Sequence, residues 1–503
     1  MRGTAQTPKA KGGRQSARGS RRRRSDSDQR QRSREAFLPE VEPPLVVRAT
    51  TATPVASDDT EPVGEDSIEV PRIPLPPMEP RLKRRFLTMV RSHMRSAPEL
   101  AAGVASLPNA GKAFAATQAA WRFLNNERVT LAALVQPLRE VGRRRAEDLQ
   151  SPFLLLVHDW CKLTFDHPDG KRDLTQLTHS TDVGYELTGV LLVSADDGCP
   201  LAPMEMHLKT ALSVLSTRDP APPELPHLDQ VLPTMVSSKL WGLSKPQLHV
   251  IDREADSVDH YRQWDAAGHK FLVRGDDRRV KWEQQSLLLS AISNILKRRR
   301  QFSEAGEAIY KGNVARLWVA ETQVVLDRPA KKNVKGKRYE RAGRALPLRL
   351  IVAQVCSETG VVLAQWLLLS NAPPEWATAE QLARCYYWRW QIESFYKLLK
   401  SHGQQLEQWQ QETGPAIARR MLVAAMACVV VWQLLADDSK PAEELKDILV
   451  RLSGRQMKRN RPHTAPALLA GLWILLSMIN LLEHVSLDRL KDLAAANPWL
   501  HSG

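Results

Sequence analysis

The sequence predicts an α/β fold in which buried strands alternate with helices. Apolar stretches of strand length recur through the middle of the chain, and two of them lead directly into an aspartate. Helical patterns precede and follow this strand-rich region, which favours a mixed sheet covered by helices. The predicted strands lie at residues 153–158, 187–194, 203–209, 247–252 and 270–274.

The first 80 residues differ in composition from the rest. Residues 1–36 carry twelve Lys and Arg against three acids, a net charge of +9, and residues 37–80 carry ten prolines and a net charge of −7. Neither part shows the periodicity of a helix or strand, and no apolar segment of a signal peptide is present. We therefore expect residues 1–80 to be disordered, basic at first and then rich in proline and acids.

The remaining chain is basic without this tail. The whole sequence has a formal charge of +15, which leaves +13 for residues 81–503. Such a charge attracts phosphate backbones and indicates a nucleic-acid partner, although a ribosomal or chromatin protein would share it. The five cysteines have no CxxC spacing and no HExxH motif occurs, so a metal site built from Cys or His is not indicated.

Residues 81–150 have the pattern of a helical domain. An amphipathic segment contains the run Trp121–Leu124, Asn125 and Asn126 then form a turn, and Thr130 is placed to cap the next helix. The run Arg143–Arg145 could contact phosphates, or it could simply interact favourably with the end of a helix.

A helix with an unusual charged face is predicted near residue 390. Thr378 and Gln381 form a capping box, Gly403 is a plausible C-terminal stop, and no proline intervenes. Four side chains fall within about 80° on this helix, because they are separated by three, seven and fourteen positions from the first. They are Tyr386, Arg389, Glu393 and Lys400, and Lys397 lies close to the same stripe. A solvated face with i,i+4 ion pairs is the alternative interpretation.

The spacing Y-x2-R-x3-E-x6-K resembles the YREK signature of bacterial DDE transposases, in the insertion-sequence-four family that includes the transposon-five transposase. The string Asp-Arg-Glu-Ala-Asp at residues 252–256 and the string Ala-Ala-Trp-Arg-Phe-Leu-Asn-Asn at residues 119–126 also resemble this family. The resemblance implies a catalytic triad of carboxylates. Glu393 would be the third, and two aspartates should leave strand ends upstream.

Two aspartates fit that expectation. Asp159 follows the apolar run 153–157, and Asp252 follows the run 248–251. An aspartate at a strand end is often only a cap or turn residue, but both fit the family's order. Trp160 and Cys161 follow Asp159, where many relatives have threonines. Carboxylates suit hard divalent cations, and two such ions can stabilise both the attacking and leaving oxygens of phosphoryl transfer. We therefore predict that Asp159, Asp252 and Glu393 bind two Mg²⁺ ions, with Mn²⁺ as an alternative.

The resemblance also implies a domain layout. Residues 81–150 would form the DNA-binding domain, residues 151–403 a ribonuclease-H-like catalytic domain, and residues 404–503 a helical region that mediates dimerisation. Asp252 and Glu393 are 141 positions apart, so a β-rich insertion is expected at about residues 280–370. Its strands would be residues 314–325, 347–356 and 361–369, with a basic loop between Lys331 and Arg341 that is either solvated or in contact with DNA.

The resemblance assigns further residues to DNA. Trp366 would stack on a flipped base, and Arg274 would contact DNA after the second aspartate. Phosphates near the scissile bond would be held by Tyr386, Arg389, Lys397 and Lys400. Without the resemblance, Trp366 would be interpreted as a core residue of a strand.

Two apolar segments occur in the carboxyl-terminal region. Residues 421–436 are too short for a typical membrane span and predict a buried helix, and residues 468–482 form a second apolar stretch. No membrane partner is expected. The region would mediate a homodimer, or it would only pack on the core.

These observations predict a DNA transposase of the bacterial cytoplasm, associated with the nucleoid. It would cut and paste an insertion sequence through metal-dependent strand cleavage, a hairpin intermediate and strand transfer. Its partners would be double-stranded DNA, both the terminal inverted repeats of the element and the target. The alternatives are an inactive or domesticated transposase that regulates by binding DNA, and a ribonuclease-H-like nuclease without transposition.

Overall fold

The computed structural model describes residues 73–95, 110–179, 181–310, 313–334, 337–457 and 463–497. Residues 1–72 of the predicted disordered tail lie outside this range. Residues 73–79 were assigned to the same tail, but Ile73 and Met78 pack against the hydrophobic core. The packed part of the chain therefore begins before residue 80.

All five predicted strands are present, within a larger set between residues 154 and 274. These strands are β1 (Leu154–Leu163), β2 (Thr175–Gln176), β3 (Val183–Val193), β4 (Pro200–Lys209), β5 (Val214–Ser216), β6 (Gln247–Ile251) and β7 (Lys270–Arg274). β1 lies between β3 and β6. It pairs antiparallel with β3 and parallel with β6, and β6 pairs parallel with β7. Long connections are needed before each parallel strand, and helices supply them.

The predicted β-rich segment adds more strands. They are β8 (Arg279–Trp282), β9 (Gln285–Leu288), β10 (Ser303–Tyr310), β11 (Asn313–Leu326), β12 (Ala330–Val334), β13 (Lys337–Arg341), β14 (Leu346–Cys356) and β15 (Val362–Ser370). The three strands expected here correspond to β11, β14 and β15. The basic loop is a two-stranded hairpin of β12 and β13.

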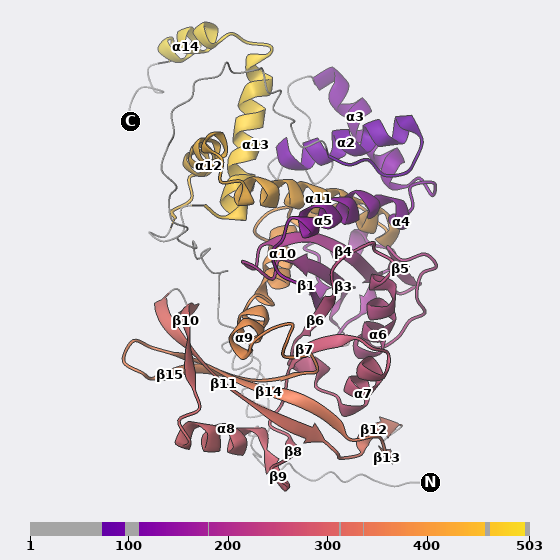
Figure 1. The fold of residues 1–503 in the computed structure, drawn as a ribbon. Coiled ribbons are helices and arrows are strands. Elements are labelled where there is room, and N and C mark those ends of the chain that lie inside the picture. The colour runs from indigo at the N-terminus through magenta and orange to yellow at the C-terminus, as the bar shows by residue number, and fades with distance from the viewer. Residues whose placement is uncertain are drawn as a thin grey trace, which may run out of the picture.

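Most of these strands extend the sheet that contains β1. β15 pairs antiparallel with β7, which continues the sheet in the order β5-β4-β3-β1-β6-β7-β15-β14-β11-β8-β9. β10 pairs with β11 and β2 with β3, so that thirteen strands are joined. Figure 1 shows the long strands of the added part at the end of the molecule opposite the terminal helices.

Helices cover the two faces of the sheet unequally. One face carries α2 (Pro80–Arg95), α3 (Ala110–Leu124), α4 (Leu131–Leu134), α5 (Gln136–Glu147), α11 (Gly414–Ala436), α12 (Lys440–Ser453) and α13 (Ala465–Leu482). α14 (Leu487–Ala495) extends beyond α13. The other face carries α6 (His227–Ser238), α7 (Val258–Ala266) and α8 (Leu289–Arg298). We call the apolar layers on these two faces the first and the second core.

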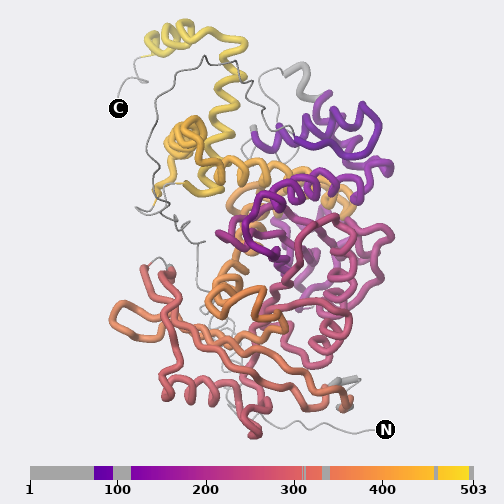
Figure 2. The backbone as a smooth tube through the Cα atoms, viewed as in Figure 1, coloured from indigo at the N-terminus to yellow at the C-terminus, as the bar shows by residue number. Residues whose placement is uncertain are grey.

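Segments from the two ends of the chain form the first core together. α2 packs against α11 and α13, which is also visible where indigo and yellow meet in Figure 2. The predicted cap is confirmed, because the Thr130 hydroxyl accepts a hydrogen bond from the backbone N–H of Ala133. Within the run Arg143–Arg145, Arg143 donates to the carbonyl of Trp241 and Arg145 to that of Pro200. These two arginines therefore bind the protein itself.

Two of the described helices are long and apolar enough to cross a membrane. α11 spans 23 residues and is longer than predicted, because it begins at Gly414 rather than near Met421. Its apolar stretch is 83% buried inside the protein, as expected for a core helix, whereas that of α13 is only 28% buried. α13 therefore leaves an apolar surface uncovered.

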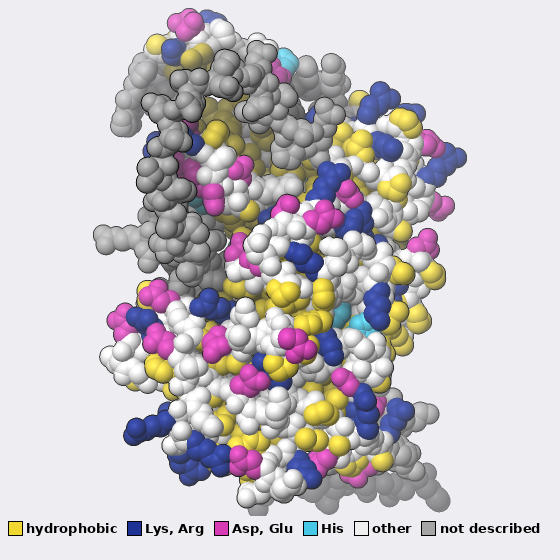
Figure 3. All heavy atoms as spheres, in the orientation of Figure 1, with side chains coloured by type: hydrophobic (Ala, Val, Ile, Leu, Met, Phe, Trp, Pro, Cys, Tyr) yellow, Lys and Arg dark blue, Asp and Glu magenta, His cyan; other side chains and the backbone are white. Residues whose placement is uncertain are grey.

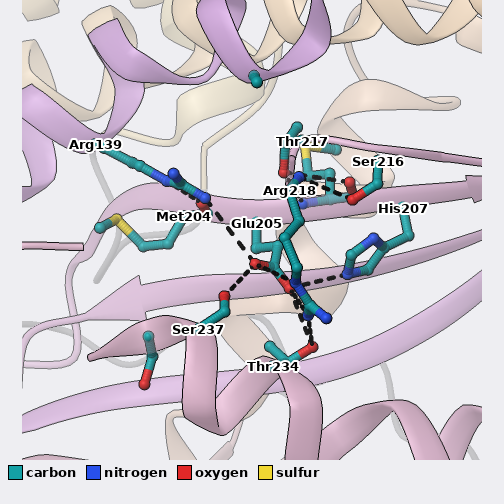
Figure 4. A network of polar contacts seen from close by, with 12 residues as sticks. Arg139, Met204, Glu205, His207, Ser216, Thr217, Arg218, Thr234 and Ser237 are labelled. Carbon is teal, nitrogen blue, oxygen red and sulfur yellow. Dashed lines mark hydrogen bonds and ion pairs between the residues drawn. The ribbon is translucent and has the colours of Figure 1, made fainter. Parts of the chain in front are cut away.

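A buried glutamate connects the sheet to α6. Glu205 on β4 is fully buried and accepts hydrogen bonds from His207 at 2.9 Å, Thr234 at 3.0 Å and Ser237 at 2.5 Å. Arg218 forms an ion pair with the same carboxylate, and Figure 4 shows these groups converging on it. Burial would raise the pKa of Glu205, but the bonds from His207 and Arg218 hold it below its usual value.

Three buried histidines form a further polar cluster at the sheet. The Nε2 of His158 on β1 lies 2.9 Å from the Nδ1 of His249 on β6, and the ring of His249 contacts that of His269. Burial lowers the pKa of His158 to about 3 and that of His269 to about 4, and it also lowers the pKa of His249. These imidazoles are therefore neutral in the folded protein at neutral pH.

Replacing Glu205 with alanine should strongly destabilise the protein. The variant leaves Arg218 and His207 without their shared partner inside the fold, and breaking a buried pair in this way typically costs about 3–5 kcal/mol. Urea unfolding measures the change. Glu224→Ala is the matched control, because Glu224 pairs with Lys209 at the surface, where such pairs contribute about 1 kcal/mol or less. Equal losses in the two variants would contradict this account of Glu205.

The free energy of unfolding should fall as pH decreases below about 6.5. Unfolded histidines bind protons near the ordinary value of 6.5, whereas His158 and His269 do so only near 3 to 4 in the folded protein. The folded state therefore has its full stability above about pH 6.5. Towards pH 4 the free energy of unfolding falls progressively, by about 1.4 kcal/mol per pH unit for each histidine. Urea titrations from pH 4 to 7.5 measure this slope. It should become shallower in His269→Gln, and an unchanged slope would argue against the assignment.

Candidate active site

Asp159 lies inside a strand rather than at its end. The prediction that the strand stops before Asp159 is wrong, because β1 continues to Leu163 through its pairing with β3. The parallel pairing with β6 nevertheless stops at Val157, paired with Val250. Asp159 is therefore two residues beyond the last position that pairs with β6, on an edge of β1 that β6 leaves open.

Asp252 lies at the strand end, as predicted. It follows Ile251, the last residue of β6, and caps the short helix η2 (Arg253–Ala255). Its Oδ1 accepts a 2.7 Å hydrogen bond from the backbone N–H of Glu254. The last aspartate of the same string, Asp256, is instead buried and bound to Arg278, so it anchors the loop. Only Asp252 of these two faces the site.

The charged helix is divided into two. α9 (Ala379–Tyr387) begins with the predicted capping box of Thr378 and Gln381, which is confirmed. α10 (Trp390–Leu399) follows after a tightened turn, in which the N–H of Arg389 bonds to the carbonyl of Tyr386 three residues earlier. The predicted stop at Gly403 is wrong, because the helix ends at Leu399.

α10 lies across β1 and β3, on the face of the first core. The hydroxyl of Tyr396 donates a 2.8 Å hydrogen bond to the backbone carbonyl of Asp159. Gly189 on β3 makes this approach possible, since a Cβ there would lie 2.8 Å from the Tyr396 hydroxyl. The contact fixes the distance of α10, the helix that carries Glu393, from the sheet and its orientation.

Arg389 connects two of the predicted carboxylates. Its Nη2 donates a 2.7 Å hydrogen bond to Glu393, and its Nη1 lies 3.7 Å from Asp159. The guanidinium is buried, with the ring of Trp390 beneath it at 4.6 Å. Burial alone would lower the pKa of Arg389, but its anionic neighbours raise it, so the group stays charged. A permanent cation thus occupies the space between Asp159 and Glu393.

The three predicted carboxyl groups lie within electrostatic reach of one another. Burial raises the pKa of Asp159 to about 7, and the negative charges of Glu393 and Asp252 contribute to this rise, while Arg389 opposes it. The pKa of Glu393 is also raised, mainly by burial and in part by Asp252. Asp159 on β1 and Glu393 on α10 therefore share Arg389, and Asp252 at the end of β6 is near enough to influence the charge of both.

Lys400 does not belong to this group. Its backbone leaves the helical conformation, and its Nζ donates to the carbonyl of Lys162 at 2.7 Å and pairs with Glu407 at 3.1 Å. The prediction that Lys400 shares a helix face with Glu393 is wrong because α10 ends one residue too early. Lys397 is exposed one turn beyond Glu393, close enough to lower the pKa of that glutamate.

Two of the aromatic residues expected to contact DNA are buried. Tyr386 lies beneath Arg389, and Trp366 on β15 packs against Tyr386 with ring centroids 5.8 Å apart. The Trp366 ring is only 8% exposed. Its stacking on a flipped base stays a prediction, and in this structure the ring supports Tyr386. Arg274 ends β7 and is half-buried near the same tyrosine.

Two residues of the site were missed from the sequence. Tyr396 is three positions after Glu393, so helical spacing could have placed it beside the predicted face. Trp160 was noted only because relatives have a different residue there. Its backbone N–H donates to the Oδ1 of Asp159 at 2.9 Å, and its indole N–H donates to Glu254 at 2.9 Å. No periodicity in the sequence indicates that second contact.

The donor chemistry at the site suits a hard divalent cation. The donors are carboxylate oxygens, and their mutual repulsion is offset mainly by Arg389, with a smaller contribution from Lys397 at Glu393. Within the described residues, no three His, Cys, Asp or Glu side chains are gathered closely enough to enclose an ion. The fit to a divalent cation therefore rests on the oxygen donors that the three carboxylates supply.

Comparison with known proteins identifies a similar solved structure but no curated relative. No curated protein matches the chain. Among solved structures, the chain is similar to one described as a cryo-EM structure of the piggyBac transposase synaptic complex with hairpin DNA. The two are 10% identical, the match covers 83% of this chain and 74% of the other, and the TM-score of 0.30 is too low to show a shared fold.

A match to a protein family covers part of the region that contains the sheet. It begins at α6, extends into α11 and includes Asp252 and Glu393, while Asp159 lies outside it. Residues 222–430 of this chain match the family described as the transposase DDE domain.

Proposed function

We propose that the protein is a DDE transposase that moves an insertion sequence by cut and paste. The convergence of Asp159, Asp252 and Glu393 around a buried arginine carries this proposal. These acids come from three separate parts of the chain, and the raised pKa values of Asp159 and Glu393 are typical of a functional site. The match of residues 222–430 to the transposase DDE domain supports the same reaction class.

We infer that β4, β3, β1, β6 and β7 form a ribonuclease-H-like core. In support, β1 has an antiparallel neighbour on one side and a parallel one on the other, and Asp159 and Asp252 lie on these two adjacent strands. The strands from β8 to β15 would be the insertion between the second aspartate and the glutamate. Because β15 pairs with β7, this insertion would be rigidly joined to the core.

The triad would bind two Mg²⁺ ions, or Mn²⁺ in their place. Bound there, the ions would stabilise charge on the attacking and leaving oxygens of an in-line displacement at phosphorus. Asp159, Asp252 and Glu393 would hold them, and Arg389 would lie beside the scissile phosphate. The buried position of Arg389 restricts its motion, so a phosphate oriented by its guanidinium would have a defined direction.

The reaction would proceed through successive hydrolysis and transesterification steps. Water would first attack the phosphodiester at the element end and release a 3′-hydroxyl. That hydroxyl would attack the opposite strand and close a hairpin, which would be reopened before strand transfer to target DNA. Each step breaks one P–O bond and forms another, so one set of carboxylates serves them all.

Cations at or near the surface would hold the DNA backbone. Lys397 is exposed on α10, and Arg274 lies at the end of β7. A further basic corner lies at the end of α8, where Lys297, Arg298 and Arg300 are exposed, and dark-blue side chains gather there at the lower left of Figure 3. Such contacts would fix the position of DNA without reading its sequence.

The uncovered face of α13 would join two copies of the chain. Ile474, Met478 and Ile479 are each at least 40% exposed on this helix. Exposed apolar surface of this kind marks association sites. A second copy fits the proposed reaction, because both ends of an element must be held in one complex.

The alternative functions differ in what accompanies DNA binding. A regulatory descendant would bind DNA without cutting it, and a nuclease would cut without joining ends to a target. Terminal inverted repeats flanking the gene would favour a mobile element. Cleavage at such repeats separates all three possibilities.

Replacing Glu393 with glutamine should abolish cleavage without preventing DNA binding. The amide keeps an oxygen acceptor for Arg389 but removes the negative charge, and we expect a loss of at least about 100-fold in the rate of phosphoryl transfer. The substrate is duplex DNA carrying the sequences that flank the gene. Mg²⁺-dependent strand cleavage and gel-shift binding are measured together.

Glu444→Ala is the control, because Glu444 is exposed on α12 and lies outside the site. It should cleave like the wild type. Binding without cleavage by the wild type would favour the regulatory alternative. Equal cleavage by the wild type and Glu393→Gln would remove Glu393 from the mechanism.

Introducing a charge on α13 should separate paired ends. Ile479→Glu places a carboxylate in the exposed apolar face, where a second copy would have to bury it without a partner. Light scattering on the DNA complex should then detect one protein per DNA end instead of two, while the affinity for a single end stays within about twofold. A dimer that persists in Ile479→Glu would show that this face is not the interface.

A further inference from the structure

Trp160 contacts Asp159 on β1 and the short helix η2 that Asp252 caps. Its backbone N–H holds the Oδ1 of Asp159 at 2.9 Å, and its indole Nε1–H donates to the Oε2 of Glu254 at 2.9 Å. The backbone N–H of Glu254 in turn holds the Oδ1 of Asp252 at 2.7 Å. A continuous series of hydrogen bonds therefore joins Asp159 to Asp252 through a single tryptophan.

The indole itself is held from its other side. Its ring stacks on that of His227 at the start of α6, with centroids 5.0 Å apart and planes 6° from parallel. His227 is bound by Glu186 on β3 at 3.2 Å. The ring is half-buried and packs against the second core, so it has a fixed surface to lie on when it binds Glu254.

The direction of the Asp252 carboxylate depends on this arrangement. Asp252 is the cap of η2, and its side chain accepts a hydrogen bond from the N–H of Glu254. Glu254 is exposed, and its bond to the indole ties η2 to β1. Groups that orient metal-binding side chains in this manner strongly affect metal affinity.

We propose that Trp160 is a positioning residue that sets the relative orientation of Asp159 and Asp252 for metal binding. This inference rests on the proposed function of the triad. The indole acts through Glu254 and does not touch the reacting atoms. Its loss should weaken metal binding while the fold and the DNA-binding surface remain intact.

The test uses the full chain and Mn²⁺ alone, with free Mn²⁺ followed by electron paramagnetic resonance. Trp160→Phe keeps an aromatic ring on His227, although a smaller one, and removes the N–H donor. We expect Mn²⁺ affinity to fall on the order of 10-fold. Trp282→Phe is the matched control. Its indole also donates a 2.9 Å hydrogen bond, to Thr322 on the added part of the sheet.

A double-mutant cycle identifies the path of the effect. Glu254→Ala should lower Mn²⁺ affinity to a similar extent, and the double variant with Trp160→Phe should be no worse than either single one, because both remove the same hydrogen bond. In the cleavage assay, Trp160→Phe should need more Mg²⁺ for half-maximal rate and should recover at saturating Mg²⁺. Melting temperature should match that of Trp282→Phe.

Unchanged Mn²⁺ affinity in Trp160→Phe, or fully additive losses in the double variant, would overturn the positioning role. Asp252→Asn distinguishes this failure from that of the proposed function. If the wild type binds Mn²⁺ and Asp252→Asn does not, the triad binds metal whatever the outcome for Trp160. If the wild type and Asp252→Asn both fail to bind Mn²⁺, the metal role of the triad and the inference built on it fall together.

Discussion

The position of α10 on the sheet is the constraint on which the candidate site depends. Glu393 is more than two hundred positions from Asp159 in the sequence, and no local structure can bring them together. The hydrogen bond from Tyr396 to the carbonyl of Asp159 does so directly, and Gly189 leaves the space for it. Any side chain at position 189 would lift the helix, and Glu393 would move away with it.

Arg389 offsets the electrostatic cost of this convergence. Burying carboxylates side by side raises their pKa values, as Asp159 shows, and an unpaired buried charge would be strongly unfavourable. A guanidinium bound to Glu393 and close to Asp159 lowers that cost while metal is absent. A lysine at this position would stabilise the two carboxylates less well. Only a planar guanidinium can face both carboxylates and also stack on Trp390.

Residues governed by local rules were predicted well from the sequence, and those governed by packing were not. The caps at Thr130 and Thr378 and the strand end at Asp252 follow from a few neighbouring residues. The extension of β1 past Asp159 depends on pairing with β3, which has no local signature. Lys400 was misplaced for a similar reason, since the end of α10 is set by contacts with Lys162 and Glu407.

Because side chains alternate between the two faces of β1, this one strand contributes both to the second core and to the candidate site. His158 and Trp160 point to the second core, and Asp159 between them points to α10 on the opposite face. The buried histidines and the indole can therefore stabilise and orient the strand from below without entering the site. A shift of one residue in the pairing of β1 would exchange these faces, placing an aspartate among the histidines and a tryptophan beside Arg389. The long pairing with β3, from Leu155 to Leu163, opposes that shift and so fixes the catalytic face.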